Sequence, residues 1–70
     1  MTIQELIEQF EIQGAFCIKT WDYEDEDYKI FAEGKDFEYE KWNLKDDYLN
    51  TKISYIYAVG GVLHIELEWE

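Results

Sequence analysis

Hydrophobic and polar positions alternate most clearly between Lys52 and Trp69. Two runs rich in β-branched and aromatic residues are separated there by Gly60-Gly61, a pattern typical of a β-hairpin with a two-residue turn. A turn of that length sets the register of its strands. The predicted cross-strand pairs are Val59 with Val62, Ala58 with Leu63, Tyr57 with His64, Ile56 with Ile65, Tyr55 with Glu66, Ser54 with Leu67 and Ile53 with Glu68.

This register gives the hairpin two faces of different character. One is aliphatic, with Ala58, Ile56, Leu63, Ile65 and Leu67, and we expect it to belong to the core. The other face presents Tyr55, Tyr57, His64, Glu66 and Glu68, with Trp69 at its end.

The N-terminal residues have the pattern of a short amphipathic helix. Thr2 and Glu5 form a capping-box sequence, and a stripe of apolar residues follows at helical spacing, consisting of Ile3, Leu6, Ile7 and Phe10. The pattern predicts a helix from Ile3 to about Phe10 or Glu11. A helix this short needs tertiary contacts, so we expect the stripe to pack on the aliphatic face of the hairpin.

The chain between Ala15 and Glu33 predicts a second hairpin. Residues Ala15–Trp21 and Tyr28–Glu33 alternate as strands do, and an acidic turn at Asp22–Asp27 joins them. After a turn at 34–36, Phe37–Leu44 also alternates, which favours a third strand. Lys45–Asn50 contains turn formers and predicts one helical turn.

These elements together predict an α+β fold. We expect one short N-terminal helix packed on a four- to five-stranded antiparallel meander sheet. A chain of 70 residues has room for one small domain, comprising residues 1–70.

The charge balance narrows the classes of partner. The chain has 17 Asp and Glu against six Lys, with no Arg, and its formal net charge is −11. Repulsion from phosphates argues against direct binding of nucleic acid or of an anionic membrane surface. A basic protein is the expected partner, although general acidity is also common among bacterial cytosolic proteins. The sequence contains a single cysteine, Cys17, and no signal-peptide or membrane-spanning pattern, so we expect a cytoplasmic protein.

The acidic turn is a weak match to a calcium-binding loop. Counting from Asp22, positions one, three, five and twelve of an EF-hand loop would be Asp22, Glu24, Glu26 and Glu33. The sixth position, where that loop needs glycine, is Asp27, and the flanking segments resemble strands. A solvated hairpin turn is the favoured interpretation, and no cofactor or metal is expected.

Few residues suit catalysis. His64 is the only histidine, and Ser54, the only serine, is expected on the opposite hairpin face. A Cys17–His64 pair remains open, because the distance between their strands does not follow from the sequence. Carboxylate pairs such as Glu38 and Glu40 share a strand face in the predicted fold, but a single small sheet offers little room for a glycosidase-type cleft. We therefore expect no enzymatic activity.

Several segments resemble small acidic proteins of phages and mobile elements in low-GC Gram-positive bacteria. They are the N-terminal Thr2–Glu8, the acidic loop after Trp21, and residues Tyr57–Glu66 around the Gly-Gly turn. Some proteins of that kind, such as anti-CRISPR proteins, mimic nucleic acid and block basic grooves. The resemblance implies that this chain inhibits a nuclease or another nucleic-acid-binding protein.

The leading hypothesis is a non-enzymatic interaction module that binds a basic protein. Its sharpest form is a nucleic-acid mimic with its acids gathered on one side. The alternative is an assembly module that forms a homodimer through its sheet. The hairpin face with Tyr55, Tyr57 and His64, here called the tyrosine face, is either the contact surface or the cover of a second small core. The candidate contact residues are Asp22, Glu24, Asp25, Glu26, Asp27, Glu38, Glu40, Asp46, Asp47, Tyr55, Tyr57, His64, Glu66 and Glu68.

Overall fold

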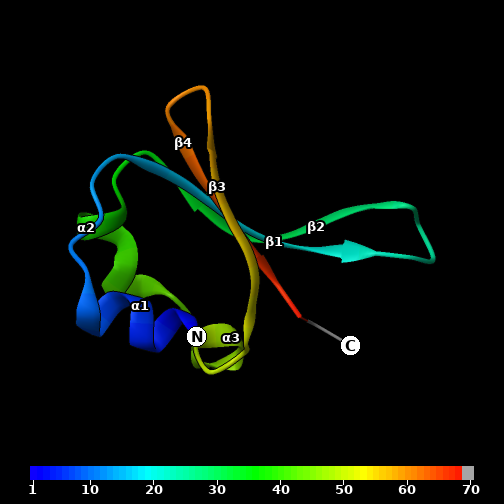
Figure 1. Ribbon diagram of the computed structural model, residues 1–70, viewed down its shortest axis with the longest axis horizontal. Coiled ribbons are helices and arrows are strands. Elements are labelled where there is room, and N and C mark those ends of the chain that lie inside the picture. Colours follow the sequence, from blue (N-terminus) through cyan, green and yellow to red (C-terminus); the bar gives the residue numbers. More distant parts are fainter. Residues whose placement is uncertain (69–70) are drawn as a thin grey trace.

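The computed structural model describes residues 1–68, which form an α+β fold with a four-stranded sheet and short helices (Figure 1). Trp69, which we expected at the end of the tyrosine face, lies outside the described residues. The elements are α1 (Ile3–Gln9), β1 (Ala15–Asp22), β2 (Asp27–Gly34), α2 (Phe37–Glu40), a 3₁₀ turn η1 (Lys41–Asn43), α3 (Asp46–Leu49), β3 (Ile53–Val59) and β4 (Val62–Leu67).

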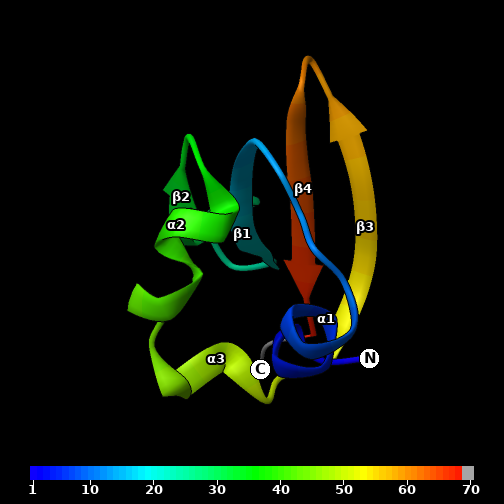
Figure 2. The ribbon, with the colours of Figure 1, turned by 90° about the vertical axis from the view of Figure 1, so that its left-hand side faces the viewer.

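The sheet is mixed, so the prediction of an antiparallel meander is wrong. Its strand order is β2-β1-β4-β3, and β1 runs parallel to β4 while the other two pairs are antiparallel. A meander would place β3 beside β2. Here the helical segment from α2 to α3 connects the two hairpins, and such a crossover allows β4 to pair with β1 in parallel (Figure 2). The strands β2 and β3 therefore form the edges.

The Gly-Gly turn and most of the predicted register are confirmed. Gly60 and Gly61 have φ values of 59° and 78°, the left-handed backbone that a tight hairpin turn requires. The five pairs from Val59–Val62 to Tyr55–Glu66 are as predicted. The remaining two are wrong, because a register shift before Tyr55 pairs Ile53 with Leu67.

The N-terminal helix begins as predicted and ends slightly earlier. Thr2 and Glu5 form the reciprocal capping box, with hydrogen bonds of 3.1 and 3.2 Å. Ile3 and Leu6 are buried in the same cluster as Ile65 of β4. Phe10 is exposed, however, because the backbone becomes extended at this residue and carries its ring out of the helical stripe.

Residues 37–43 are helical, which contradicts the strand prediction for Phe37–Leu44. The side chain of Asp36 caps α2 by accepting a hydrogen bond from the backbone of Tyr39. Phe37 is fully buried and meets Phe16 of β1 edge to face, with 5.2 Å between ring centroids. A helical turn places this one ring in the core and leaves Tyr39 in solvent.

One hydrophobic cluster joins the helices to the inner face of the sheet. It contains Ile3, Leu6, Phe16, Ile18, Phe37, Tyr48, Ile65 and Leu67. In Figures 1 and 2 the helices lie on one side of the sheet, and the arm formed by β1 and β2 extends beyond them. The aliphatic face of the last hairpin is only partly core, since Ile56 on the edge strand β3 is 44% exposed. The predicted helical turn at Lys45–Asn50 is present as α3, which buries Tyr48.

Within residues 1–68, none of the helices has the length and apolar character needed to cross a membrane.

Candidate functional site

The side of the sheet opposite the helices carries most of the polar and aromatic side chains of the strands. Because side chains alternate along a strand, the residues between the core positions Phe16, Ile18, Ile65 and Leu67 point to this side. We call it the outer face. It comprises Cys17, Lys19 and Trp21 of β1, Tyr28 of β2, Tyr55 and Tyr57 of β3, and His64 and Glu66 of β4.

Lys19 lies at the centre of the outer face and is only 9% exposed. Its ammonium nitrogen is 3.1 Å from Nδ1 of His64 and 4.1 Å from the ring centroid of Tyr28. It also lies 5.6 Å from the ring centroid of Tyr57, which stacks on the His64 imidazole. The cation is thus held by two aromatic ring faces and one nitrogen, which compensates for its burial.

Glu66 accepts hydrogen bonds from tyrosines on both edge strands. The Tyr57 hydroxyl donates to Oε2 at 2.6 Å, and the Tyr28 hydroxyl donates to the same oxygen at 3.4 Å. The bond to this carboxylate is the main reason that the pKa of Tyr57 is raised above 10.0. Burial, followed by the charge of Glu66, raises the pKa of Tyr28. Both phenols are therefore held protonated as donors.

Cys17 and His64 are register partners on the parallel strands β1 and β4. The sequence had left their distance open, and the fold brings them together. Burial raises the pKa of the Cys17 thiol, and Glu33 adds to this effect while Lys19 opposes it. Nδ1 of His64 faces Lys19. Since the thiolate is the nucleophilic form of cysteine, this environment is unfavourable for nucleophilic catalysis.

Exposed aromatic rings continue from the outer face along the arm. Trp21 packs edge to face on Tyr28, with 5.0 Å between ring centroids, and lies 6.5 Å from Tyr23. Tyr23 in the turn is 84% exposed, and Tyr55 at the other edge of the sheet is 67% exposed. In contrast to these rings, Tyr57 and His64 are half-buried.

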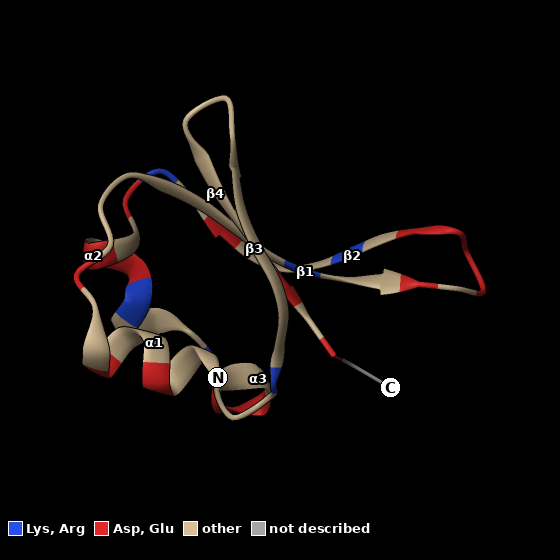
Figure 3. Cartoon of the chain, in the orientation of Figure 1, with Lys and Arg blue, Asp and Glu red and all other residues tan. Residues whose placement is uncertain are grey.

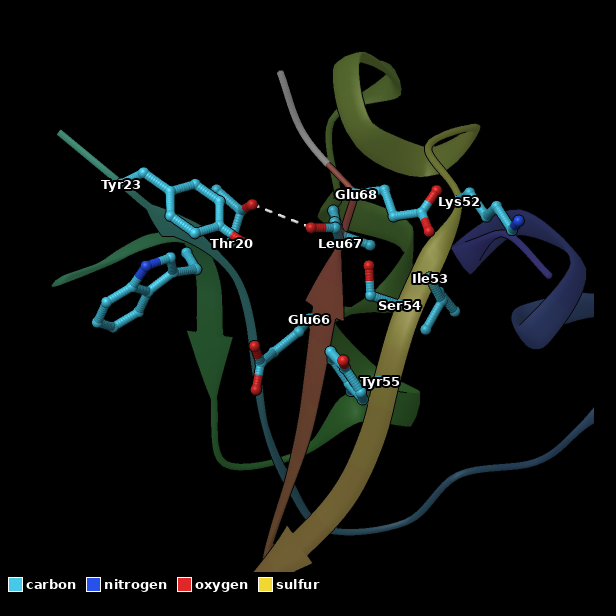
Figure 4. A pocket seen from close by; sticks show the side chains of 10 residues that line it. Thr20, Tyr23, Lys52, Ile53, Ser54, Tyr55, Glu66, Leu67 and Glu68 are labelled. Carbon is cyan, nitrogen blue, oxygen red and sulfur yellow. Dashed lines mark hydrogen bonds between the residues drawn. The ribbon is translucent and has the colours of Figure 1, made fainter. Parts of the chain in front are cut away.

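A groove opens where β1 and β4 separate. Their pairing ends at Lys19 and Glu66, after which β1 continues with β2 alone and β4 with β3 alone. The hydroxyl of Thr20 still donates to the Leu67 carbonyl at 2.9 Å and closes the floor of the groove (Figure 4). The lining residues are Thr20, Trp21, Tyr23, Lys52, Ile53, Ser54, Tyr55, Glu66, Leu67 and Glu68.

The acidic turn lies at the tip of the arm, away from the helices (Figure 3). Asp22 Oδ1 accepts hydrogen bonds from the backbone of Glu24 at 2.9 Å and of Asp25 at 3.4 Å. Glu26 adopts a positive φ of 51° within the turn, and Asp27 pairs with Asp22. The turn therefore orders its backbone with its own carboxylates and keeps the other acids in solvent.

The other predicted contact acids lie elsewhere on the molecule. Glu38 makes an ion pair of 2.9 Å with Lys41 and accepts a 3.2 Å bond from the backbone of Ile12. The Lys41 bond is the main reason that the pKa of Glu38 is lowered. Glu40 accepts from the backbone of Asp36 at 3.4 Å. Asp46 and Asp47 occupy the first turn of α3.

The acids do not gather on one side as the mimic hypothesis required. In Figure 3 they appear at the tip of the arm and on the helices at the opposite end of the long axis. The fold brings together Tyr55, Tyr57, His64 and Glu66, with Glu68 at the adjacent groove. No group of three or more His, Cys, Asp or Glu side chains within residues 1–68 is arranged to hold a metal ion.

Lys19, Trp21 and Tyr28 also belong to this surface, which the sequence did not predict. The alternating pattern of β1 placed Lys19 and Trp21 on the same face of that strand. It gave no sign that β1 pairs with β4, so that this face and the face of β4 with His64 and Glu66 form one surface. A lysine among apolar and aromatic residues in a strand was the available signal. No known protein family, curated protein or solved structure matches this chain.

Proposed function

We propose that this protein is a non-enzymatic acidic module, located in the cytoplasm, that binds a basic protein partner. The observation that carries the proposal is the combination of exposed rings and carboxylates along the outer face and the arm. Trp21, Tyr23 and Tyr55 are exposed there, next to the acidic turn and Glu68. Tyr and Trp supply much of the binding energy at protein interfaces, and rim carboxylates attract a basic partner.

We propose more specifically that the module mimics nucleic acid and thereby inhibits a nuclease or another nucleic-acid-binding protein. The net charge of −11 and the resemblance to small acidic phage proteins support this form. Glu38 and Glu40 are engaged in hydrogen bonds within the fold. Because the acids are spread over both ends of the molecule, the phosphate-like surface would be limited to the turn Asp22–Asp27.

The test starts with capture of partners from host extract at low salt and continues with titration of one purified partner. We expect affinity to fall steeply from 0.1 M to 1 M salt, as the Debye length shortens from about 10 Å to about 3 Å. Tyr55→Ala should weaken binding, whereas Tyr39→Ala, which removes a ring that is at least as exposed from α2, should not. Affinity that is independent of salt would refute the proposal, as would equal effects of the two substitutions.

A second candidate is an assembly module that dimerises through its sheet. The edge strand β3 favours it, because Ile56 and Val59 are exposed there on a strand edge that no other strand of residues 1–68 pairs with. Sedimentation at micromolar and lower concentrations tests this candidate. A stable monomer throughout that range would eliminate it.

A further inference from the structure

The groove between the diverging ends of β1 and β4 suits one particular chemical group. We propose that it binds an arginine side chain of the protein partner, with the guanidinium group held between aromatic rings and the carboxylate of Glu66. This inference rests on the proposed function, because it names the group that the basic partner presents.

The rings of the groove come from both of its sides. Trp21 and Tyr23 belong to the β1 side, and Tyr55 belongs to β3. Tyr23 and Tyr55 are largely exposed, so their ring faces are accessible to a ligand. A guanidinium group is planar and weakly hydrated, and it stacks on aromatic faces better than an ammonium group does.

The groove has one carboxylate at each end, Glu66 and Glu68. Both phenols donate to Oε2 of Glu66, and among residues 1–68 no group donates to its Oε1. Glu68 is exposed at the rim and lies beside Lys52 (Figure 4). In Figure 4, Glu66 and Tyr55 lie at the opposite end of the groove from Lys52. We therefore expect the guanidinium group at the Glu66 end, away from the positive charge of Lys52.

The adjacent surface already holds a cation in the same manner. The ammonium group of Lys19 lies on the ring of Tyr28, whose hydroxyl donates to Glu66. Lys19 is also the register partner of Glu66. A cation of the protein itself thus lies on the ring of a tyrosine that donates to Glu66, and the groove, which Glu66 also lines, offers further rings that are open to solvent.

The test uses two short acetylated peptides of equal charge, Gly-Arg-Gly-Arg-Gly and its lysine analogue, followed by NMR at low salt. We expect the arginine peptide to bind more tightly and to shift the backbone signals of Tyr55 and Glu66 most. Glu66→Gln should weaken its affinity about fivefold, the size of one ion pair at the surface. Glu24→Gln removes the same charge from the acidic turn and should weaken it less than twofold.

Equal affinity for the two peptides would overturn the arginine site, and so would equal weakening by the two substitutions. Absence of binding by either peptide at low salt would overturn it as well. In each of these cases the proposed function is still tested separately. Its test is the effect of salt and of Tyr55→Ala on the affinity for the purified protein partner. Circular dichroism of both variants establishes that they are folded.

Discussion

The hydroxyl of Tyr57 donates a 2.6 Å hydrogen bond to Oε2 of Glu66, joining the edge strand β3 to the central strand β4 on the outer face. Tyr28 donates to the same oxygen from β2, at the opposite edge of the sheet. One carboxylate therefore links both edge strands across the sheet. This link holds Tyr57 and Tyr28 on either side of Lys19 and gives the outer face a defined arrangement.

The first prediction concerns the stability of this link at high pH. The pKa of Tyr57 is raised above 10.0, so its protonated form is favoured in the folded state. The resulting stabilisation is complete below pH 10 and is lost as the pH rises through the folded-state pKa. We expect Tyr57→Phe to lose less stability above pH 10 than the unsubstituted protein, measured by urea denaturation.

Absorbance at 295 nm provides a direct check, because it follows the ionisation of tyrosine. Glu66→Gln should lower the pKa of Tyr57, since it removes the acceptor charge that raises it. Glu68→Gln, an exposed change two residues away, is the matched control. Identical titration curves for the protein and for Glu66→Gln would contradict this account.

The second prediction concerns the ammonium group of Lys19. Lys19→Met keeps most of the buried stem but removes the contacts with Tyr28 and His64. We expect a loss of about 1 kcal/mol in the free energy of unfolding. Lys19→Ala also removes the stem and should cost about 2 kcal/mol. If Lys19→Met is as stable as the unsubstituted protein, the buried charge of Lys19 contributes nothing to the free energy of unfolding.

The third prediction tests the helical position of Phe37. This ring is fully buried against Phe16, so Phe37→Ala should cost about 3 to 5 kcal/mol. Phe37→Leu keeps most of the volume and should cost about 1.5 kcal/mol or less. Tyr39→Ala, at a position that is 77% exposed, should change stability by less than about 0.5 kcal/mol.

Chemical denaturation of these three variants distinguishes the helix from the strand suggested by the sequence. In a strand, Phe37 and Tyr39 would share one face and would be buried or exposed together. Similar losses of stability for Phe37→Ala and Tyr39→Ala would therefore contradict the helix α2.

The fourth prediction concerns the turn between β3 and β4. Gly61 has a φ of 78°, which is unfavourable for residues with a Cβ atom. Gly61→Ala should cost about 1 kcal/mol, whereas Gly60→Asn should cost less because asparagine tolerates a φ of 59°. Thermal unfolding of both variants provides the comparison, and the reverse order of stability would contradict the assigned turn.

The fifth prediction concerns acid stability. The pKa of Glu38 is lowered from 4.5, mainly by Lys41 and also by the backbone of Ile12. Its stabilising effect is present above pH 4.5 and is lost as the pH falls through the lower folded-state pKa. We expect Glu38→Gln to be less stable at neutral pH and to lose less stability on acidification. Glu24→Gln, which removes the same charge from the turn, is the control for net charge.

The features that the sequence alone determined are local. The capping box of Thr2 and Glu5, the Gly60-Gly61 turn, and the pairing of Tyr57 with His64 all depend on residues close together in the chain. A helix cap and a two-residue turn are closed by nearby hydrogen bonds and by allowed φ angles, so the residue types suffice to predict them. The tyrosine face of the last hairpin followed from that register.

Long-range packing decided the remaining features. The parallel pairing of β1 with β4 placed Lys19 between Tyr28 and His64, and the separation of these strands beyond Glu66 opened the groove. The burial of Phe37 against Phe16 made its segment a helix despite an alternating pattern. Contacts between residues far apart in the chain depend on which elements meet in space, and the periodicity of a single segment carries no information about that choice.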